Sequence, residues 1–212
     1  MTLTGTEESG PLRVGIPIGD LVAGIYAAFG VVVALCERKQ SGRGQHVQTS
    51  LLETLVSLLS LQAARYLLAG EIPGPAGNHH PLIVPTGTFE AKDGHVNLAV
   101  GTEAQWRRLC EVVSLPDLAD DPRFCSFQMR AEHRRELLEI LSAQFKERPR
   151  AEWLKRLEDG DIAAGPVYRI DEVFQDPQVL GTGMIQEIPH PTIGTLRMVG
   201  FPVKLRLTLT KW

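Results

Sequence analysis

GIPIGDLVAGIYAAFGVVVALCERK, residues 15–39, decides how the first third of the chain folds. From Leu21 to Lys39 apolar residues occur on every side of a helical projection, which predicts a helix that is buried all round. The uncharged stretch from Leu21 to Cys36 is shorter than the roughly 20 residues that a membrane-spanning helix needs. We therefore expect a core helix of a globular protein, without a membrane as partner.

The segment after this helix predicts a second apolar helix beside the first. Residues 41–44 predict a turn with glycine where a helix C-terminus favours it, residues 45–49 a short strand, and residues 51–68 a second mostly apolar helix that ends at Gly70. Two helices without polar faces cannot bury each other completely. We therefore expect a further layer over them, supplied by a partner subunit or by a longer polypeptide.

From residue 73 onward the composition changes. Proline, glycine and asparagine in residues 73–78 predict a linker, and the rest predicts a small α+β domain with two hairpins. The expected elements are paired strands at 86–91 with 95–100 and at 185–188 with 195–199, helices at 103–113, 130–147 and 151–157, a loop at 116–124, a strand at 166–170, and a short helix at 171–174 capped by Asp171.

Charge and cysteine usage exclude several classes of protein. The 212 residues contain 22 Lys and Arg against 25 Asp and Glu, a formal net charge of −3, which does not favour nucleic acid as a partner. Cys36, Cys110 and Cys125 form no CxxC motif, which argues against disulfides and a cysteine zinc site and favours a cytoplasmic protein. The sequence has no glycine-rich phosphate-binding loop, so we expect no dinucleotide or P-loop site. Because neither the cysteines nor the histidines occur at metal-ligand spacing, we also expect no metal.

Asp20 is the first candidate for chemistry. It directly precedes the apolar run, so one interpretation is a helix N-cap. The other is a nucleophile, because the helix dipole keeps a carboxylate ionised at this end, and such a carboxylate beside an activated thioester can attack it. Gly15 and Gly19 would let a substrate approach the backbone closely. The residues alone leave both interpretations open.

Three other segments are candidates of lower specificity. Arg43-Gly44-Gln45 fits a helix C-cap turn. Gly77-Asn78-His79-His80 fits a solvated turn or a loop that covers a substrate, and the histidine pair has no third metal ligand at a suitable spacing. Glu103 follows a predicted strand and starts a predicted helix, where a glutamate favours the helix N-terminus.

Taken together, these segments resemble one family. The motifs that carry the resemblance are GIPIGDL at 15–21, SGRGQ at 41–45, GNHHP at 77–81, FEAKDG at 89–94, QW at 105–106, DPRF at 121–124, GPV at 165–167, DPQV at 176–179 and HP at 190–191. The chain is similar to the class III, CaiB/BaiF-like CoA-transferases, which include formyl-CoA transferase, the carnitine CoA-transferases and the α-methylacyl-CoA racemases. Within this family it is most similar to transferases of dicarboxylic acyl groups, of the succinate–hydroxymethylglutarate type.

The resemblance implies an α/β family fold and a covalent mechanism. Asp20 matches the aspartate that attacks the acyl-CoA thioester to form an aspartyl mixed anhydride, then an aspartyl-CoA thioester, from which an acceptor carboxylate takes the CoA. Gly77, Asn78, His79 and His80 match the loop that closes over these intermediates. The implied partners are an acyl-CoA and a free carboxylic acid. Coenzyme A enters as a substrate thioester, no cofactor stays bound, and full-length relatives form an interlocked homodimer.

The same resemblance implies a chain that is truncated at both ends. Residues 1–72 match a partial large domain without the Rossmann-like half that holds CoA, residues 73–185 match the small α+β domain, and residues 186–212 match a segment that returns toward the large domain. Two alternatives stay open. The first is an enzyme like the α-methylacyl-CoA racemases, because Glu103 matches the position where racemases of the family carry an acid/base glutamate. The second is a non-catalytic fragment that needs a partner to bind CoA.

Overall fold

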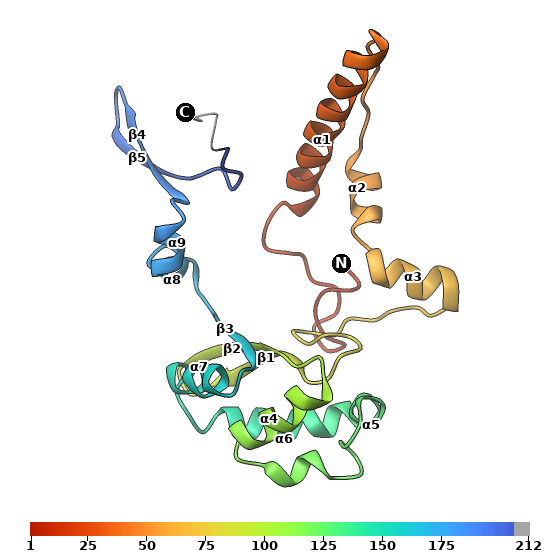
Figure 1. Cartoon of the computed structure of the whole chain (residues 1–212), viewed down its shortest axis with the longest axis vertical. Helices are drawn as coiled ribbons and strands as arrows, with labels where there is room; N and C mark the ends of the chain where they lie inside the picture. Colours follow the sequence, from red (N-terminus) through yellow and green to blue (C-terminus); the bar gives the residue numbers. More distant parts are fainter. Residues whose placement is uncertain (206–212) are drawn as a thin grey trace. The chain divides into compact units, whose positions relative to one another are not determined.

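A computed structural model describes residues 1–205 of the chain. The chain divides into two compact units, Met1–Pro81 and Leu82–Trp212 (Figure 1). The finer division predicted from the sequence, with boundaries at residues 72 and 185, stays a prediction.

The first unit is built on α1, Ile18–Ser41, which confirms the predicted long helix. The helix begins directly after Pro17, a residue that suits this position because its missing N–H needs no acceptor there. It ends at Gly42, whose left-handed conformation lets its N–H donate to the carbonyl of Arg38 at 2.9 Å. Of the residues in α1 only Ala23 is buried.

By length and composition α1 is able to cross a bilayer. The helix length expected from the sequence was too short, because it counted only the uncharged stretch from Leu21 to Cys36. The helix also includes a polar first turn and a charged last turn. The next two helices, within residues 51–69, meet the same criteria of length and apolar composition only if they are counted together as one bent span. One such helix is weak evidence for a membrane protein, and the absence of a membrane partner stays a prediction.

The predicted strand at residues 45–49 is wrong. This segment is extended but belongs to neither sheet of the described chain, and it runs back along α1 instead. A Cβ on Gly30 of α1 would lie 2.8 Å from Cγ1 of Val47, so the glycine leaves room for the Val47 side chain against the helix. Side-chain packing on a helix has therefore replaced the strand pairing that the sequence pattern indicates.

The predicted helix 51–68 is two helices, α2 (Leu51–Ser57) and α3 (Ser60–Ala69), with a bend of 74° between them. Ser50 caps α2 and accepts the N–H of Glu53 at 3.2 Å. Near the break, the Ser57 hydroxyl donates to the carbonyl of Thr54 at 2.7 Å, a bond that competes with the helical ladder, and Ser60 has a φ of 42°. Because both sides of the break are equally apolar, hydrophobic periodicity could not locate it.

The second unit contains a three-stranded antiparallel sheet. The predicted first hairpin is confirmed as β1 (Thr86–Ala91) and β2 (Gly94–Ala99), with Phe89 opposite Val96. The third strand, β3 (Ala163–Val167), pairs with β2 and starts three residues earlier than predicted. The apolar residues after it do not extend the strand because Arg169 already caps the next helix, and its backbone N–H donates to the Glu172 carboxylate at 2.8 Å.

Helices cover this sheet and supply its core. α4 (Glu103–Val112) and α7 (Arg150–Asp159) match the predicted helices, and a 3₁₀ turn, η1 (Pro116–Ala119), lies in the predicted loop. α6 (Arg134–Phe145) packs against β1, and α7 against β2 and β3 (Figure 1). The largest fully buried side chains are Phe89, Trp106, Phe124, Arg130, Phe145, Trp153, five leucines and Val96.

The predicted helix 130–147 is wrong in its start and in its continuity. The structure has α5 (Phe127–Glu132) and α6 (Arg134–Phe145), which meet at His133. Ser126 caps α5 by accepting the N–H of Met129 at 3.3 Å. Because α5 is a separate turn of helix, Arg130 points into the core instead of lying on an exposed face.

The remaining elements are short. α8 (Ile170–Val173) has Arg169 at its N-cap, so the prediction of Asp171 as the cap is wrong by two residues. α9 (Pro177–Gly181) is capped by Asp176. The second predicted hairpin is confirmed as β4 (Ile185–His190) and β5 (Gly194–Val199).

Candidate active site

Asp20 lies in the first turn of α1, at the third helical residue. Its interpretation as the N-cap is wrong, because the helix already begins at Ile18 and Pro17 occupies the cap position. The Asp20 side chain is exposed and accepts no hydrogen bond within the described part of the chain. An unengaged carboxylate in the positive end of a long helix is therefore available to a ligand.

Backbone donors accompany this carboxylate. The N–H of Ile18 donates to Ile16 at 2.8 Å and the N–H of Leu21 donates to Pro17 at 3.0 Å. The N–H groups of Gly19 and Asp20 between them have no acceptor among residues 1–205. Such amides suit the oxyanion that forms when a nucleophile attacks a thioester carbonyl.

α2 supports this first turn. A Cβ on Gly19 would meet the side chain of Leu55 at 3.5 Å, so the start of α1 rests against α2. Thr54, the preceding residue on α2, is buried, and its hydroxyl has no hydrogen-bond partner in the described residues. The first turn of α1 is therefore backed by another helix on one side and open on the side of Asp20.

The predicted substrate loop belongs to the same unit as Asp20. Gly77 adopts a φ of 61° and donates its N–H to the carbonyl of Gly5 at 2.8 Å, while the N–H of His79 donates to Ala76 at 3.3 Å. Asn78 is exposed, and His79 and His80 are partly buried. Among the described residues no group of three or more metal-binding side chains is found. The structure thus connects this loop to Gly5, a residue that the sequence motifs do not single out.

Glu103 lies in the other unit, at the start of α4, where Thr102 is the N-cap. Both of its carboxylate oxygens accept hydrogen bonds from the Arg130 guanidinium, at 2.9 and 3.0 Å, and one also accepts the N–H of Phe127 at 2.9 Å. The hydrogen bond from Arg130 is the main reason that the pKa of Glu103 lies below its ordinary value.

Arg130 is buried and makes several further contacts in the core. Beyond Glu103, it donates to the carbonyls of Val84 and Phe124, both at 3.1 Å, and its guanidinium lies 5.1 Å from the centre of the Trp106 ring. The sequence contains no signal for this arrangement, because Arg130 occurs among many charged residues of helical spacing. The acid/base role of Glu103 stays a prediction, and these contacts do not favour it, since a carboxylate held ionised by a buried cation is a weak base.

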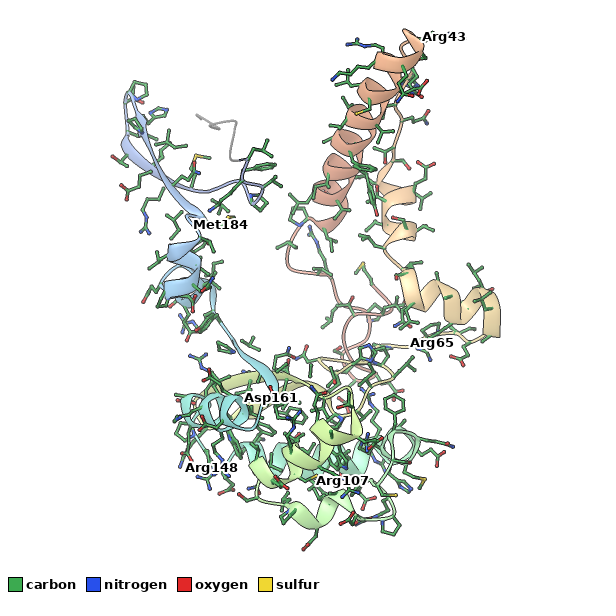
Figure 2. The ribbon with its side chains drawn as sticks, viewed as in Figure 1. Arg43, Arg65, Arg107, Arg148, Asp161 and Met184 are labelled. Atoms are coloured by element: carbon green, nitrogen blue, oxygen red, sulfur yellow. The ribbon has the colours of Figure 1, made fainter. Side chains whose placement is uncertain are left out.

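The Arg43-Gly44-Gln45 segment lies at the opposite end of α1 from Asp20 (Figure 2). The 24 residues of the helix separate the two ends by about 36 Å. Gly42 forms the left-handed C-cap there, which confirms the turn that was predicted for this segment.

Comparison with known proteins identifies the family. The chain matches CoA-transferase family III over residues 1–212. It belongs to this family. The resemblance drawn from GIPIGDL, SGRGQ and GNHHP is thereby confirmed.

Several relatives of this family III chain have named activities. It is 34% identical over 204 residues to the succinyl-CoA:glutarate CoA-transferase of Mus musculus, covering 96% of this chain and 47% of that protein. It is 32% identical over 210 residues to the succinyl-CoA:mesaconate CoA-transferase of Haloarcula marismortui, covering 99% of this chain and 52% of that protein. The chain thus spans about half the length of these curated relatives.

Solved structures confirm the expected fold of the family III chain. A CaiB/BaiF family protein from Brucella suis superimposes with a TM-score of 0.80 at 30% identity, covering 97% of this chain and 53% of that one. A Mycobacterium tuberculosis protein, Rv3272, has a TM-score of 0.81 at 21% identity and shows a shared fold. The apolar helices and the small α+β unit are therefore part of the α/β fold of the family.

Proposed function

We propose that Asp20 is the nucleophile of a CoA-transferase that moves CoA from an acyl-CoA to a free dicarboxylic acid. The observation that carries this proposal is the unengaged Asp20 carboxylate in the first turn of α1, beside the free N–H groups of Gly19 and Asp20. Membership of CoA-transferase family III across the chain supports it.

The proposed reaction conserves the energy of the thioester through covalent steps on Asp20. A carboxylate oxygen of Asp20 attacks the thioester carbonyl, the C–S bond breaks, and CoA thiolate leaves from an aspartyl mixed anhydride. The thiolate attacks the aspartyl carbonyl and releases the donor acid, which forms the aspartyl-CoA thioester. The acceptor carboxylate attacks that thioester and expels the thiolate again. Attack of the thiolate on the acceptor's acyl carbon then gives the new acyl-CoA and regenerates Asp20.

The relatives' names support the choice of substrate class. Succinate, glutarate and mesaconate are dicarboxylates, and the named proteins transfer CoA between pairs of them. We therefore propose a dicarboxylic acyl group as donor or acceptor, coenzyme A as a substrate without a permanently bound cofactor, and the Gly77, Asn78, His79 and His80 loop as a cover over the intermediates. A homodimer, or a partner that supplies the CoA-holding half, completes the proposed cytoplasmic enzyme.

Trapping tests the nucleophile directly. The 212-residue chain is incubated with succinyl-CoA and then hydroxylamine, and its intact and peptide masses are measured. We expect an adduct or hydroxamate on the peptide that contains Asp20, and its loss in Asp20→Asn. Asp117→Asn is the matched control, because Asp117 is also an exposed aspartate in the first turn of a helix, η1, and should leave the adduct unchanged. A persistent adduct in Asp20→Asn would refute the proposal.

The alternatives give different results. A racemase would exchange the α-proton of a 2-methylacyl-CoA for deuterium without a covalent adduct. The engagement of Glu103 by Arg130 does not favour this outcome. A non-catalytic fragment would show neither an adduct nor CoA binding until a partner is added.

A further inference from the structure

The N-terminal loop, residues 4–12, is closed by its own hydrogen bonds. The N–H of Leu12 donates to Thr4 at 3.0 Å, and the N–H of Gly10 donates to Thr6 at 3.1 Å. Thr6 and Ser9 also bind each other through backbone N–H groups and hydroxyls, at 2.8 and 3.1 Å. This loop therefore has a defined shape without belonging to a helix or strand.

Gly5 is the residue of this loop that only glycine can occupy. Its φ is 107°, and a Cβ would lie 2.5 Å from the carbonyl oxygen of Gly10 and 2.8 Å from the hydroxyl of Ser9. The carbonyl that Gly5 presents in this conformation accepts the N–H of Gly77 at 2.8 Å. The N-terminal loop and the segment that carries Gly77 therefore lie side by side (Figure 1).

The contact is close on the Gly77 side as well. Gly77 has a φ of 61°, and a Cβ there would lie 3.3 Å from Cγ2 of Thr6. A side chain at residue 77 would thus push against the loop that holds its N–H. At both of these positive-φ glycines, therefore, an added side chain would meet atoms of the N-terminal loop.

We propose that the N-terminal loop sets the conformation of the substrate loop Gly77–His80, and that Gly5 is a positioning residue for that loop. The link to catalysis rests on the proposed function, in which the substrate loop covers the covalent intermediates. Gly5 itself needs no contact with substrate. Its carbonyl holds the amide at the start of the loop, and the turn from Ala76 to His79 follows from that point.

Hydrogen exchange of the residue 77 amide tests the contact without any need for activity. In the full chain, Gly5→Ala should accelerate this exchange about tenfold, because the hydrogen bond that protects it is lost. Gly10→Ala is the matched control. Gly10 is another positive-φ glycine of the same loop, and a Cβ there has no neighbour within 4 Å. Equal exchange rates in Gly5→Ala and the wild type, or equal acceleration by both variants, would overturn the proposal.

A second pair of variants covers the case in which Gly5→Ala does not fold. Gly77→Ala should accelerate exchange at residue 77 through both its positive φ and its contact with Thr6. Thr6→Ser removes the contacting methyl group but keeps the hydroxyl that accepts the Ser9 N–H. In the variant that combines Gly77→Ala with Thr6→Ser, the exchange rate at residue 77 should return part of the way toward the wild-type rate. If the effects of the two substitutions on the logarithm of this rate are strictly additive, the two residues do not contact each other and the proposal is overturned.

The adduct assay separates this proposal from the proposed function. Asp20→Asn should abolish the adduct and leave exchange at residue 77 at the wild-type rate. Where the wild type forms the adduct, Gly5→Ala should slow its formation about tenfold, and Gly10→Ala should not. Faster exchange with an unchanged rate of adduct formation would overturn the positioning role. If the wild type forms no adduct, the exchange results still decide whether Gly5 holds the loop.

Discussion

α1 and α6 are both rich in apolar residues, but they bury very different amounts of surface. α6 has 12 residues and buries Leu137, Leu141 and Phe145 completely. α1 has 24 residues and buries only Ala23, while Phe29 and Ile25 each keep 66% of their surface exposed. The difference lies in the neighbours: α6 packs against a sheet and α1 packs against α2 and an extended segment. A helix is buried only where another layer lies against it.

This comparison indicates where the folding free energy of the chain is located. The second unit has a continuous core around Trp106, Trp153 and Phe145. The first unit presents a large apolar surface that no described residue covers. We therefore expect the second unit to fold by itself and the first to depend on a covering layer. Substitutions in the two units test this difference.

Phe145→Ala should destabilise the second unit by about 3–5 kcal/mol. The ring of Phe145 stacks on Phe89 with 4.8 Å between ring centres and touches Trp153 at 4.7 Å, so its loss opens a cavity in the core. Urea unfolding followed by tryptophan fluorescence measures the change. Phe29→Ala on α1 is the matched control and should change the unfolding free energy by less than about 0.5 kcal/mol. Equal losses in both variants would contradict the comparison.

Arg130→Met should cost about 3 kcal/mol, because it removes the cation and leaves Glu103 and two buried carbonyls without their donor. The same urea titration applies. Arg135→Met is a suitable control, since Arg135 is exposed and lies at 3.9 Å from Glu139 in a surface pair. If both arginine variants unfold at the same urea concentration, the Arg130 network does not stabilise the unit.

Acid should weaken the second unit through Glu103. The folded-state pKa of Glu103 lies below its ordinary value of 4.5, so the stabilisation is complete above pH 4.5 and is lost as the pH falls through the folded-state value. Unfolding free energies measured from pH 7 down to pH 3 should therefore decrease less steeply in Glu103→Gln than in the wild type. At pH 7 this substitution should cost about 1 kcal/mol, because the carboxylate is half exposed. Parallel pH profiles would exclude this contribution.

Phe29→Lys combined with Val33→Lys should have the smallest effect on unfolding of the second unit, less than about 0.5 kcal/mol. Its effect should appear in association instead, because the two substitutions place charges on the exposed apolar surface of α1. Sedimentation velocity of the 212-residue chain should show less self-association than for the wild type. Unchanged self-association would mean that α1 is not the surface through which the chains associate.

Much of the fold and part of the site could be predicted from local patterns. The apolar run predicts α1, the Lys92-Asp93-Gly94 turn predicts the β1–β2 hairpin, and motifs such as GIPIGDL predict the family. These features depend on residues that are close together in the sequence, so they can be predicted without the tertiary structure. The breaks between α2 and α3 and at His133 have no such signal, because apolar or charged periodicity continues through both of them.

The long apolar helix with Asp20 near its start follows from the amino-acid sequence alone, because helix formation and the preference of a carboxylate for the first turn depend on residues a few positions apart. Contacts between distant parts of the chain depend instead on tertiary folding. Arg130 holds Glu103 and Gly5 holds Gly77 because folding brings together residues that are far apart in sequence. The exposure of α1 also depends on the tertiary structure. The apolar pattern of a helix indicates that a covering layer would be favourable, but the helix is buried only where such a layer is present.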